Sequence, residues 1–318
     1  MKKIFLSGLL LLSASLVLGS CGQSTDQGNA ETTADFTVMT TFYPMYEFTK
    51  EVVGDVGTVE LLIPAGTEPH DYEPSAKDIA KLSESDVFVY NSAEMETWVA
   101  DTLQDFDTEK TTVVEAASGI DLVASAEEEE HDDHADHDHE DDHSHELDPH
   151  VWLDPVYAQA EVKTITAALI KAHPEAQATF EKNSAAYLAK LAALDEKYQT
   201  ALAGATQRTF VTQHAAFGYL ARRYDLTQAS VSGLSPDEEP SPSRLAELKE
   251  FVTAHQISVI YAEEAASAKV AETLAKEAGV ELSVLNPLEG LSKEAIAAGS
   301  NYLTVMEENL QHLQLTIK

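Results

Sequence analysis

The chain has 318 residues, of which 44% are hydrophobic and 24% charged, and its formal net charge is −35. This composition is typical of a globular protein, and the length allows one large domain or two medium ones. The acidic balance disfavours nucleic acid and anionic lipid headgroups as partners and favours metal cations.

The first twenty residues have the pattern of a signal peptide. Residues 1–3 are MKK, and residues 4–18 form an apolar stretch too short to span a membrane comfortably. The sequence LGSC at 18–21 resembles the lipobox of bacterial lipoproteins, which implies cleavage before Cys21 and lipidation of its thiol. The alternative is an ordinary secretory signal with a chance cysteine. Both alternatives predict a mature protein outside the cytoplasm, with residues 21–35 as a flexible tether.

Strands and helices alternate through residues 36–172, which we expect to form an N-terminal lobe. Runs rich in β-branched and aromatic residues predict strands, and segments with capping residues or helical spacing predict helices. The expected strands are 36–42, 59–63, 86–91 and 111–114, and the expected helices are 43–53, 76–82, 96–103 and 155–172. This alternation predicts an α/β fold with a mainly parallel sheet, whose binding sites lie beyond the carboxyl ends of the strands.

An acidic, histidine-rich run interrupts this lobe at residues 127–146. It holds twelve acidic residues and six histidines, and the rest of the chain is acidic too. Such a run cannot build a packed core, so we expect a disordered loop. Imidazole is a common ligand of zinc, copper and nickel, so the loop is expected to bind metal weakly. Its histidines are His131, His134, His137, His139, His143 and His145.

One long helix is predicted between this lobe and a second one. The His173-Pro174 step ends the preceding helix, and apolar residues recur at helical spacing from there to residue 202. At about 1.5 Å per residue this helix would be roughly 40 Å long, so residues 173–203 are assigned as a linker helix. The alternation restarts in residues 204–318, the expected C-terminal lobe. Its expected strands are 208–212, 228–232, 257–261 and 281–285, and its expected helices are 215–224, 244–255 (capped by Ser243), 267–278 and most of 291–315.

Three histidines outside the acidic run share one sequence context. His70, His150 and His214 each lie in a short polar segment next to an apolar run. Each signal alone also fits a histidine that only bonds its own loop. Together they predict a tetrahedral zinc site that needs one more ligand. The other three are interpreted as surface residues: His173, His255 and His312.

Four motifs resemble those of one protein family. They are EPHDYEP at 68–74, DPHVWLDP at 148–155, TQHAAF at 212–217 and GLSPDEEPSP at 233–242. In this order they resemble the metal-binding (cluster A-I) solute-binding lipoproteins of bacterial ABC importers, in particular the zinc-specific branch. The resemblance covers residues 36–318 and includes the acidic histidine-rich loop. It implies two α/β lobes joined by one rigid helix, in agreement with the pattern of expected elements.

The resemblance implies that His70, His150 and His214 are the first three metal ligands. Manganese-binding relatives carry a carboxylate at the position of His214. The histidine here therefore indicates zinc, because imidazole suits zinc whereas additional carboxylates suit the harder manganese ion.

The fourth ligand of the family is a carboxylate from the loop after the last strand. That loop offers Glu289 here. Glu263 and Glu264, which follow the expected strand 257–261, are alternative carboxylates, and water is a third alternative because some zinc-binding relatives use it.

We therefore interpret the chain as a zinc-binding protein and not as an enzyme. It is expected to capture Zn²⁺ outside the membrane, as a lipid-anchored monomer, and to deliver the ion to an ABC permease. A zinc-dependent hydrolase is the first alternative, since three histidines with one open position are also a catalytic pattern. Against it, no HExxH motif lies on any expected helix. A surface adhesin with incidental metal binding is the second.

Overall fold

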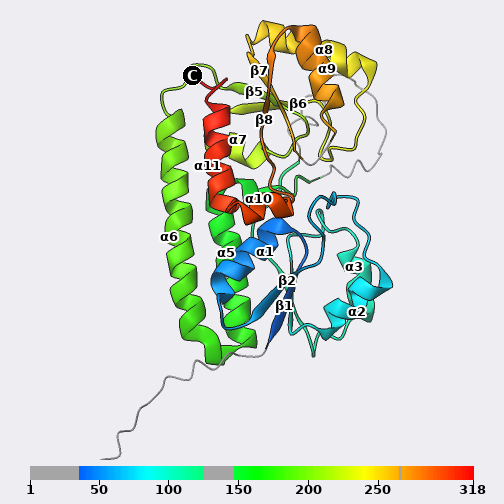
Figure 1. Ribbon diagram of the computed structural model, residues 1–318, viewed down its shortest axis with the longest axis vertical. Helices are drawn as coiled ribbons and strands as arrows, with labels where there is room; N and C mark the ends of the chain where they lie inside the picture. The colour runs from blue at the N-terminus through cyan, green and yellow to red at the C-terminus, as the bar shows by residue number, and fades with distance from the viewer. Residues whose placement is uncertain (1–35, 125–146, 265–266) are drawn as a thin grey trace, which may run out of the picture. The chain divides into compact units, whose positions relative to one another are not determined.

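The computed structural model describes residues 36–124, 147–264 and 267–318 (Figure 1). The signal peptide, Cys21, the tether and the six histidines of the acidic run lie outside these residues. The described residues all belong to one compact unit, Thr33–Lys318.

The first sheet consists of four parallel strands in the order β2-β1-β3-β4. The strands are β1 (Thr37–Thr40), β2 (Thr58–Leu61), β3 (Val87–Tyr90) and β4 (Thr112–Glu115). Strand β3, with the sequence VFVY, is buried along its whole length, whereas the edge strand β2 alternates between exposed and half-buried residues. This contrast is expected of a parallel sheet whose central strands are covered on both faces.

The second sheet repeats the same arrangement. Its four parallel strands run in the order β6-β5-β7-β8. The strands are β5 (Thr209–Thr212), β6 (Thr227–Ser230), β7 (Val259–Ala262) and β8 (Glu281–Val284). The predicted fold class, two mainly parallel sheets flanked by helices, is confirmed.

Helices and short 3-10 turns connect the strands. In the first half they are α1 (Tyr43–Val53), α2 (Ala76–Glu84), α3 (Val99–Thr102), η1 (Leu103–Asp105), η2 (Val151–Leu153), α5 (Pro155–Ala172) and η3 (Pro174–Ala176). The rest are α6 (Gln177–Leu202), α7 (Gly218–Arg223), α8 (Pro242–Ala254), α9 (Lys269–Ala278), α10 (Lys293–Ala297) and α11 (Tyr302–Leu313). Local signals explain several starts: Ser75 and Asp78 form a capping box before α2, and Asp154 caps α5 with Pro155 in its first turn.

Helix α6 runs alongside both halves of the described fold (Figure 1). It packs against α1 and α5 in the first half and against α11 in the second. The residues expected on its apolar face are all buried: Phe180, Tyr187, Leu191, Leu194, Tyr198 and Leu202. Tyr198 Oη also donates to Met306 O at 2.6 Å. Because each such burial stabilises the fold by about 1.5–3 kcal/mol, this face fixes α6 to both halves.

Several expected elements differ in their bounds. Helix α8 is capped by Ser241 and not by Ser243, because Pro242 takes the first turn, where its missing N–H is not needed. The helix expected at 215–224 begins only at Gly218. The long helix expected at 291–315 is two helices, separated at Gly299, whose φ of +98° ends α10. The helix expected at 96–103 is reduced to α3 and η1.

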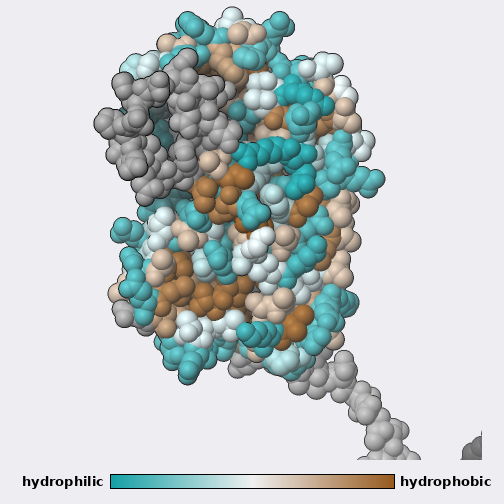
Figure 2. Space-filling model, turned by 180° about the vertical axis from the view of Figure 1, so that it is seen from behind, coloured by the Kyte–Doolittle hydropathy of each residue, from teal (hydrophilic) through white to brown (hydrophobic). Residues whose placement is uncertain are grey.

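Figure 2 shows one face of the molecule, on which hydrophilic residues are interspersed with hydrophobic patches. Among the described residues, the large hydrophobic side chains that are exposed are Leu282, Ile296 and Leu315. No helix within the described ranges has the length and apolar character that crossing a bilayer requires.

Candidate metal centre

The four predicted ligand residues follow the carboxyl ends of four different strands. His70 lies in the loop after β2, His150 lies beyond β4 at the start of η2, His214 follows β5, and Glu289 follows β8. Because the strands of a parallel sheet all end at one edge, residues far apart in sequence meet there. Two of the four come from each sheet, so the site lies where the carboxyl edges of both sheets face each other.

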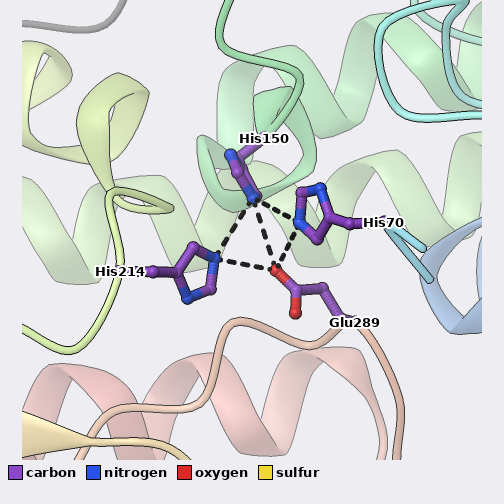
Figure 3. A group of neighbouring side chains, drawn as sticks. All are labelled: His70, His150, His214 and Glu289. Atoms are coloured by element: carbon purple, nitrogen blue, oxygen red, sulfur yellow. Dashed lines mark hydrogen bonds and ion pairs between the residues drawn. The ribbon is translucent and has the colours of Figure 1, made fainter. Parts of the chain in front are cut away.

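The ligand atoms of these four residues all lie within 4.8 Å of one another (Figure 3). His150 Nε2 lies 3.2 Å from His70 Nε2 and 3.3 Å from His214 Nε2. Glu289 Oε1 lies 3.1 Å from His214 Nε2, 3.3 Å from His150 Nε2 and 3.5 Å from His70 Nε2. Zinc bonds of about 2.0–2.1 Å place the ligands of a tetrahedral ion about 3.3 Å apart. These five separations therefore match the edges of one tetrahedron.

The group is almost completely removed from solvent. His150 and His214 are 0% exposed, and Glu289 is 5% exposed. The His70 side chain, at 10%, is the most accessible of the four. Burial in surroundings of low dielectric constant strengthens every electrostatic interaction with an ion bound there.

Two carboxylates hold two of the imidazoles from outside the group. Asp148 Oδ1 accepts from the backbone N–H of His150 at 2.9 Å and lies 2.7 Å from its Nδ1. Glu263 Oε1 accepts from the backbone N–H of His214 at 3.2 Å and lies 2.6 Å from its Nδ1. A carboxylate that accepts from Nδ1–H leaves the Nε2 lone pair free for a metal. The structure thus places Glu263, the alternative fourth ligand, behind His214, while Glu264 is exposed beside Asn286.

The turn that carries Glu289 is held in an unusual conformation. Leu288, fully buried, has a φ of +61°, in the left-handed region that disfavours bulky residues. Its N–H donates to Asn286 Oδ1 at 2.8 Å. The side chain of Asn309 in α11 holds Asn286 at both its N–H and its carbonyl oxygen, at 2.9 and 2.8 Å. These contacts stabilise the strained turn that directs Glu289 toward the three histidines.

The sequence matches the model of a family described as zinc-uptake complex component A, periplasmic, over residues 38–315. The chain belongs to this family.

Relatives within the family carry names that concern zinc. The chain is 50% identical over 310 residues to the high-affinity zinc uptake system protein ZnuA of Bacillus subtilis, covering 97% of this chain and 96% of that protein. It is 52% identical over 317 residues to the zinc-binding lipoprotein AdcA of Streptococcus pneumoniae, covering 99% of this chain but 61% of AdcA. The structure of the Zn(II)-bound ZnuA-like domain of AdcA superposes with a TM-score of 0.76 at 49% identity, covering 89% of this chain and 99% of that domain. In this chain the residues His70, His150, His214 and Glu289 offer the ligand types that zinc takes in proteins.

Burial and neighbouring charges shift the pKa values of the site residues in opposite directions. Burial alone would lower the pKa of His214, but the carboxylates of Glu263 and Glu289 outweigh it and raise that pKa well above its usual value. The pKa of His150 is also raised, because Asp148 and Glu289 outweigh its burial. Burial alone would raise the pKa of Glu289, but His214 and the hydrogen bonds to the imidazoles hold it well below its usual value. Zinc must therefore displace protons to bind.

Sequence reasoning gave no role to Glu68 or Asp148, although each stands two residues before a predicted ligand. Glu68 Oε1 accepts from the backbone N–H of His70 at 3.1 Å. Burial, together with repulsion from Glu289, raises the pKa of Glu68 to about 7. The repeated acid-Pro-His spacing was the signal available in the sequence, because it lets the acid bond the histidine backbone in both loops.

The remaining described histidines lie outside the centre. His255 is exposed, as predicted. His173 and His312 are half-buried and not simply on the surface: His173 stacks on Phe36 with ring centroids 3.9 Å apart, and His312 Nδ1 donates to Val284 O at 2.6 Å. The spacing of apolar residues did not reveal these partners because they are distant in sequence: Phe36 directly precedes β1, and Val284 ends β8.

Proposed function

We propose that this protein captures one Zn²⁺ through His70, His150, His214 and Glu289 and passes it to an ABC permease for zinc uptake. The observation that carries this proposal is the convergence of three Nε2 atoms and one carboxylate oxygen at the separations of a zinc tetrahedron. The names of its relatives, a zinc uptake protein and a zinc-binding lipoprotein, support the same function.

The donor set favours zinc over other divalent ions. Three imidazoles and a single carboxylate suit a borderline ion, whereas Mg²⁺, Ca²⁺ and Mn²⁺ prefer shells rich in oxygen. Cu²⁺ binds nitrogen more strongly in general but prefers tetragonal geometry. Because His150 and His214 are buried and each is held by a carboxylate at Nδ1, these two imidazoles resist rearrangement around such an ion.

Transport fits the site better than hydrolysis. A catalytic zinc keeps one position open for water, with three protein ligands around it. Here Glu289 completes a set of four protein ligands, so we propose that the protein is not an enzyme. The adhesin alternative has no support from the metal centre, because a buried ion offers nothing to a partner's surface.

We further propose that the protein works outside the cytoplasm, as a monomer anchored to the membrane by lipid on Cys21. The printed description of the family, a periplasmic component, and the name of the AdcA lipoprotein support this location. In this organisation residues 1–20 are removed, residues 21–35 form the tether, and residues 173–203 link lobes 36–172 and 204–318. Cys21→Ala should abolish lipid labelling and leave the zinc affinity of the purified protein unchanged; normal labelling would contradict the anchor.

Metal analysis of protein purified without a tag tests the central proposal. After dialysis against a weak chelator, which strips loosely bound ions, we expect one zinc per chain. His150→Ala should lose this zinc, while His255→Ala, which changes an exposed histidine, should retain it. In cells, His150→Ala should also fail to support growth in zinc-poor medium. A tight zinc retained by His150→Ala, or a different metal in the unaltered protein, would refute the assignment.

A further inference from the structure

Tyr219 lies outside every motif that the sequence singled out, yet it joins three segments around the metal centre. It is the second residue of α7, in the half of the chain that carries His214, and it is 3% exposed. Its ring packs edge-on against Tyr157 of α5, with centroids 5.6 Å apart. Its hydroxyl donates to Asp148 O at 2.7 Å and accepts from the N–H of Val123 at 3.1 Å.

The Tyr219 hydroxyl occupies a gap in a short backbone pairing. Asp148 N–H donates directly to Val123 O at 2.8 Å. The reciprocal bond, from Val123 N–H to Asp148 O, does not form directly; the hydroxyl lies between these two groups and bonds both. The Asp148 C=O is buried and the Val123 N–H is part-buried, and backbone groups shielded from water need partners. The position of the Asp148 backbone therefore depends on the side chain of Tyr219.

Asp148 transmits this position to the metal centre. Its backbone carbonyl is held by Tyr219, and its carboxylate holds the backbone N–H and Nδ1 of His150. Gly218 allows the start of α7 to lie close to the Asp148 carboxylate, because a Cβ added there would lie 2.7 Å from Asp148 Oδ2. Only a short segment separates Tyr219 from His214, so the start of α7 relates the His214 segment to the one that carries His150.

We propose that Tyr219 is a positioning residue for zinc, which sets the separation of His150 and His214 by holding Asp148 across the two halves of the fold. This inference rests on the proposed ligand assignment. The 3.3 Å between the two Nε2 atoms matches an edge of the zinc tetrahedron without any movement. Because these two ligands are already held at this separation, zinc binding loses little conformational entropy in ordering them.

Tyr219→Phe tests the proposal in the purified protein, because it removes one hydroxyl and keeps the ring contact. The matched control is Tyr157→Phe, which removes the hydroxyl from the other ring of the pair and leaves Asp148 untouched. Three quantities are measured for each: the zinc Kd by chelator competition, the visible absorption of the Co²⁺-loaded protein, and the melting temperature without metal. Co²⁺ absorption reports ligand geometry, which a purely structural role would not change.

Tyr219→Phe should raise the zinc Kd about tenfold, as loss of groups that support metal ligands commonly does, and should alter the Co²⁺ spectrum. Tyr157→Phe should change neither. Gly218→Ala, which pushes directly on the Asp148 carboxylate, should raise the Kd at least as much.

A lower melting temperature with unchanged Kd and Co²⁺ spectrum in Tyr219→Phe would overturn the positioning role and leave the ligand assignment intact. If the unaltered protein itself gave no tetrahedral Co²⁺ spectrum, the ligand assignment would fail, and the Tyr219 inference with it.

Discussion

Glu289→Gln is the sharpest test of how this site binds zinc. The substitution keeps the shape of the side chain and an oxygen atom but removes the negative charge that lies among the three imidazoles. Glu289 is 5% exposed, and its Oε1 is within 3.1–3.5 Å of all three Nε2 atoms. Among the four proposed ligands, Glu289 is the one that carries a negative charge.

The size of the effect follows from the charges. A carboxylate whose charge centre lies about 3 Å from Zn²⁺ attracts it by about 11 kcal/mol at an effective dielectric constant of about 20. Burying that carboxylate costs several kcal/mol, and the amide oxygen of glutamine restores part of the lost attraction. A net loss on the order of 3 kcal/mol is expected, which raises the zinc Kd about 100-fold.

Competition with a fluorescent zinc chelator at pH 7 measures this change. Glu264→Gln is the matched control, because Glu264 is an exposed glutamate in a neighbouring loop whose nearest described partner is Asn286 at 3.5 Å. Glu263→Gln should have an intermediate effect, about tenfold, because it removes a group that orients His214. The ligand assignment is wrong if Glu289→Gln stays within threefold of the unaltered protein while Glu263→Gln loses more.

Three further outcomes are expected. Zinc affinity should fall as the pH is lowered, beginning above pH 6.5 because the pKa values of His150 and His214 are raised and zinc must displace their protons; a Kd that stays constant between pH 8 and pH 6.5 would contradict this. Glu161 is buried with no hydrogen-bond partner among the described residues, and burial raises its pKa well above the usual value, so the folded state holds its proton more tightly than the unfolded state. The contribution of Glu161 to the free energy of unfolding should therefore decline as pH rises above about 4.5. In denaturant unfolding, the stability of Glu161→Gln relative to the unaltered protein should grow by up to about 1.4 kcal/mol per pH unit. A stability difference that stays constant with pH would show that Glu161 does not titrate in this range. Deleting residues 127–146 should remove weak metal binding and leave one tight zinc, because Ala124 and Leu147 already form an antiparallel bridge that a two-residue turn can close; loss of the tight zinc would mean that the loop supplies a ligand.

The sequence by itself determined the order of the elements and the identity of the candidate ligands. Helix α1 begins and ends at the residues expected, and the apolar face of α6 is the one that its spacing predicted. These features are local: they depend on capping residues, proline positions and apolar periodicity, which act within a few residues of where they are written. The motifs likewise contain His70, His150 and His214, and the resemblance to the family pointed to Glu289 in the loop after the last strand.

Tertiary structure alone decided how these residues act on one another. The sequence left three carboxylates and water as candidates for the fourth position. Only the fold places Glu289 among the three Nε2 atoms, Glu263 behind His214 and Glu264 at the surface. The role of Tyr219 was equally invisible, since its hydroxyl bonds residues 71 and 96 positions away in the chain. Pairings over such distances depend on how two sheets and one long helix pack, and no pattern confined to a few neighbouring residues encodes that packing.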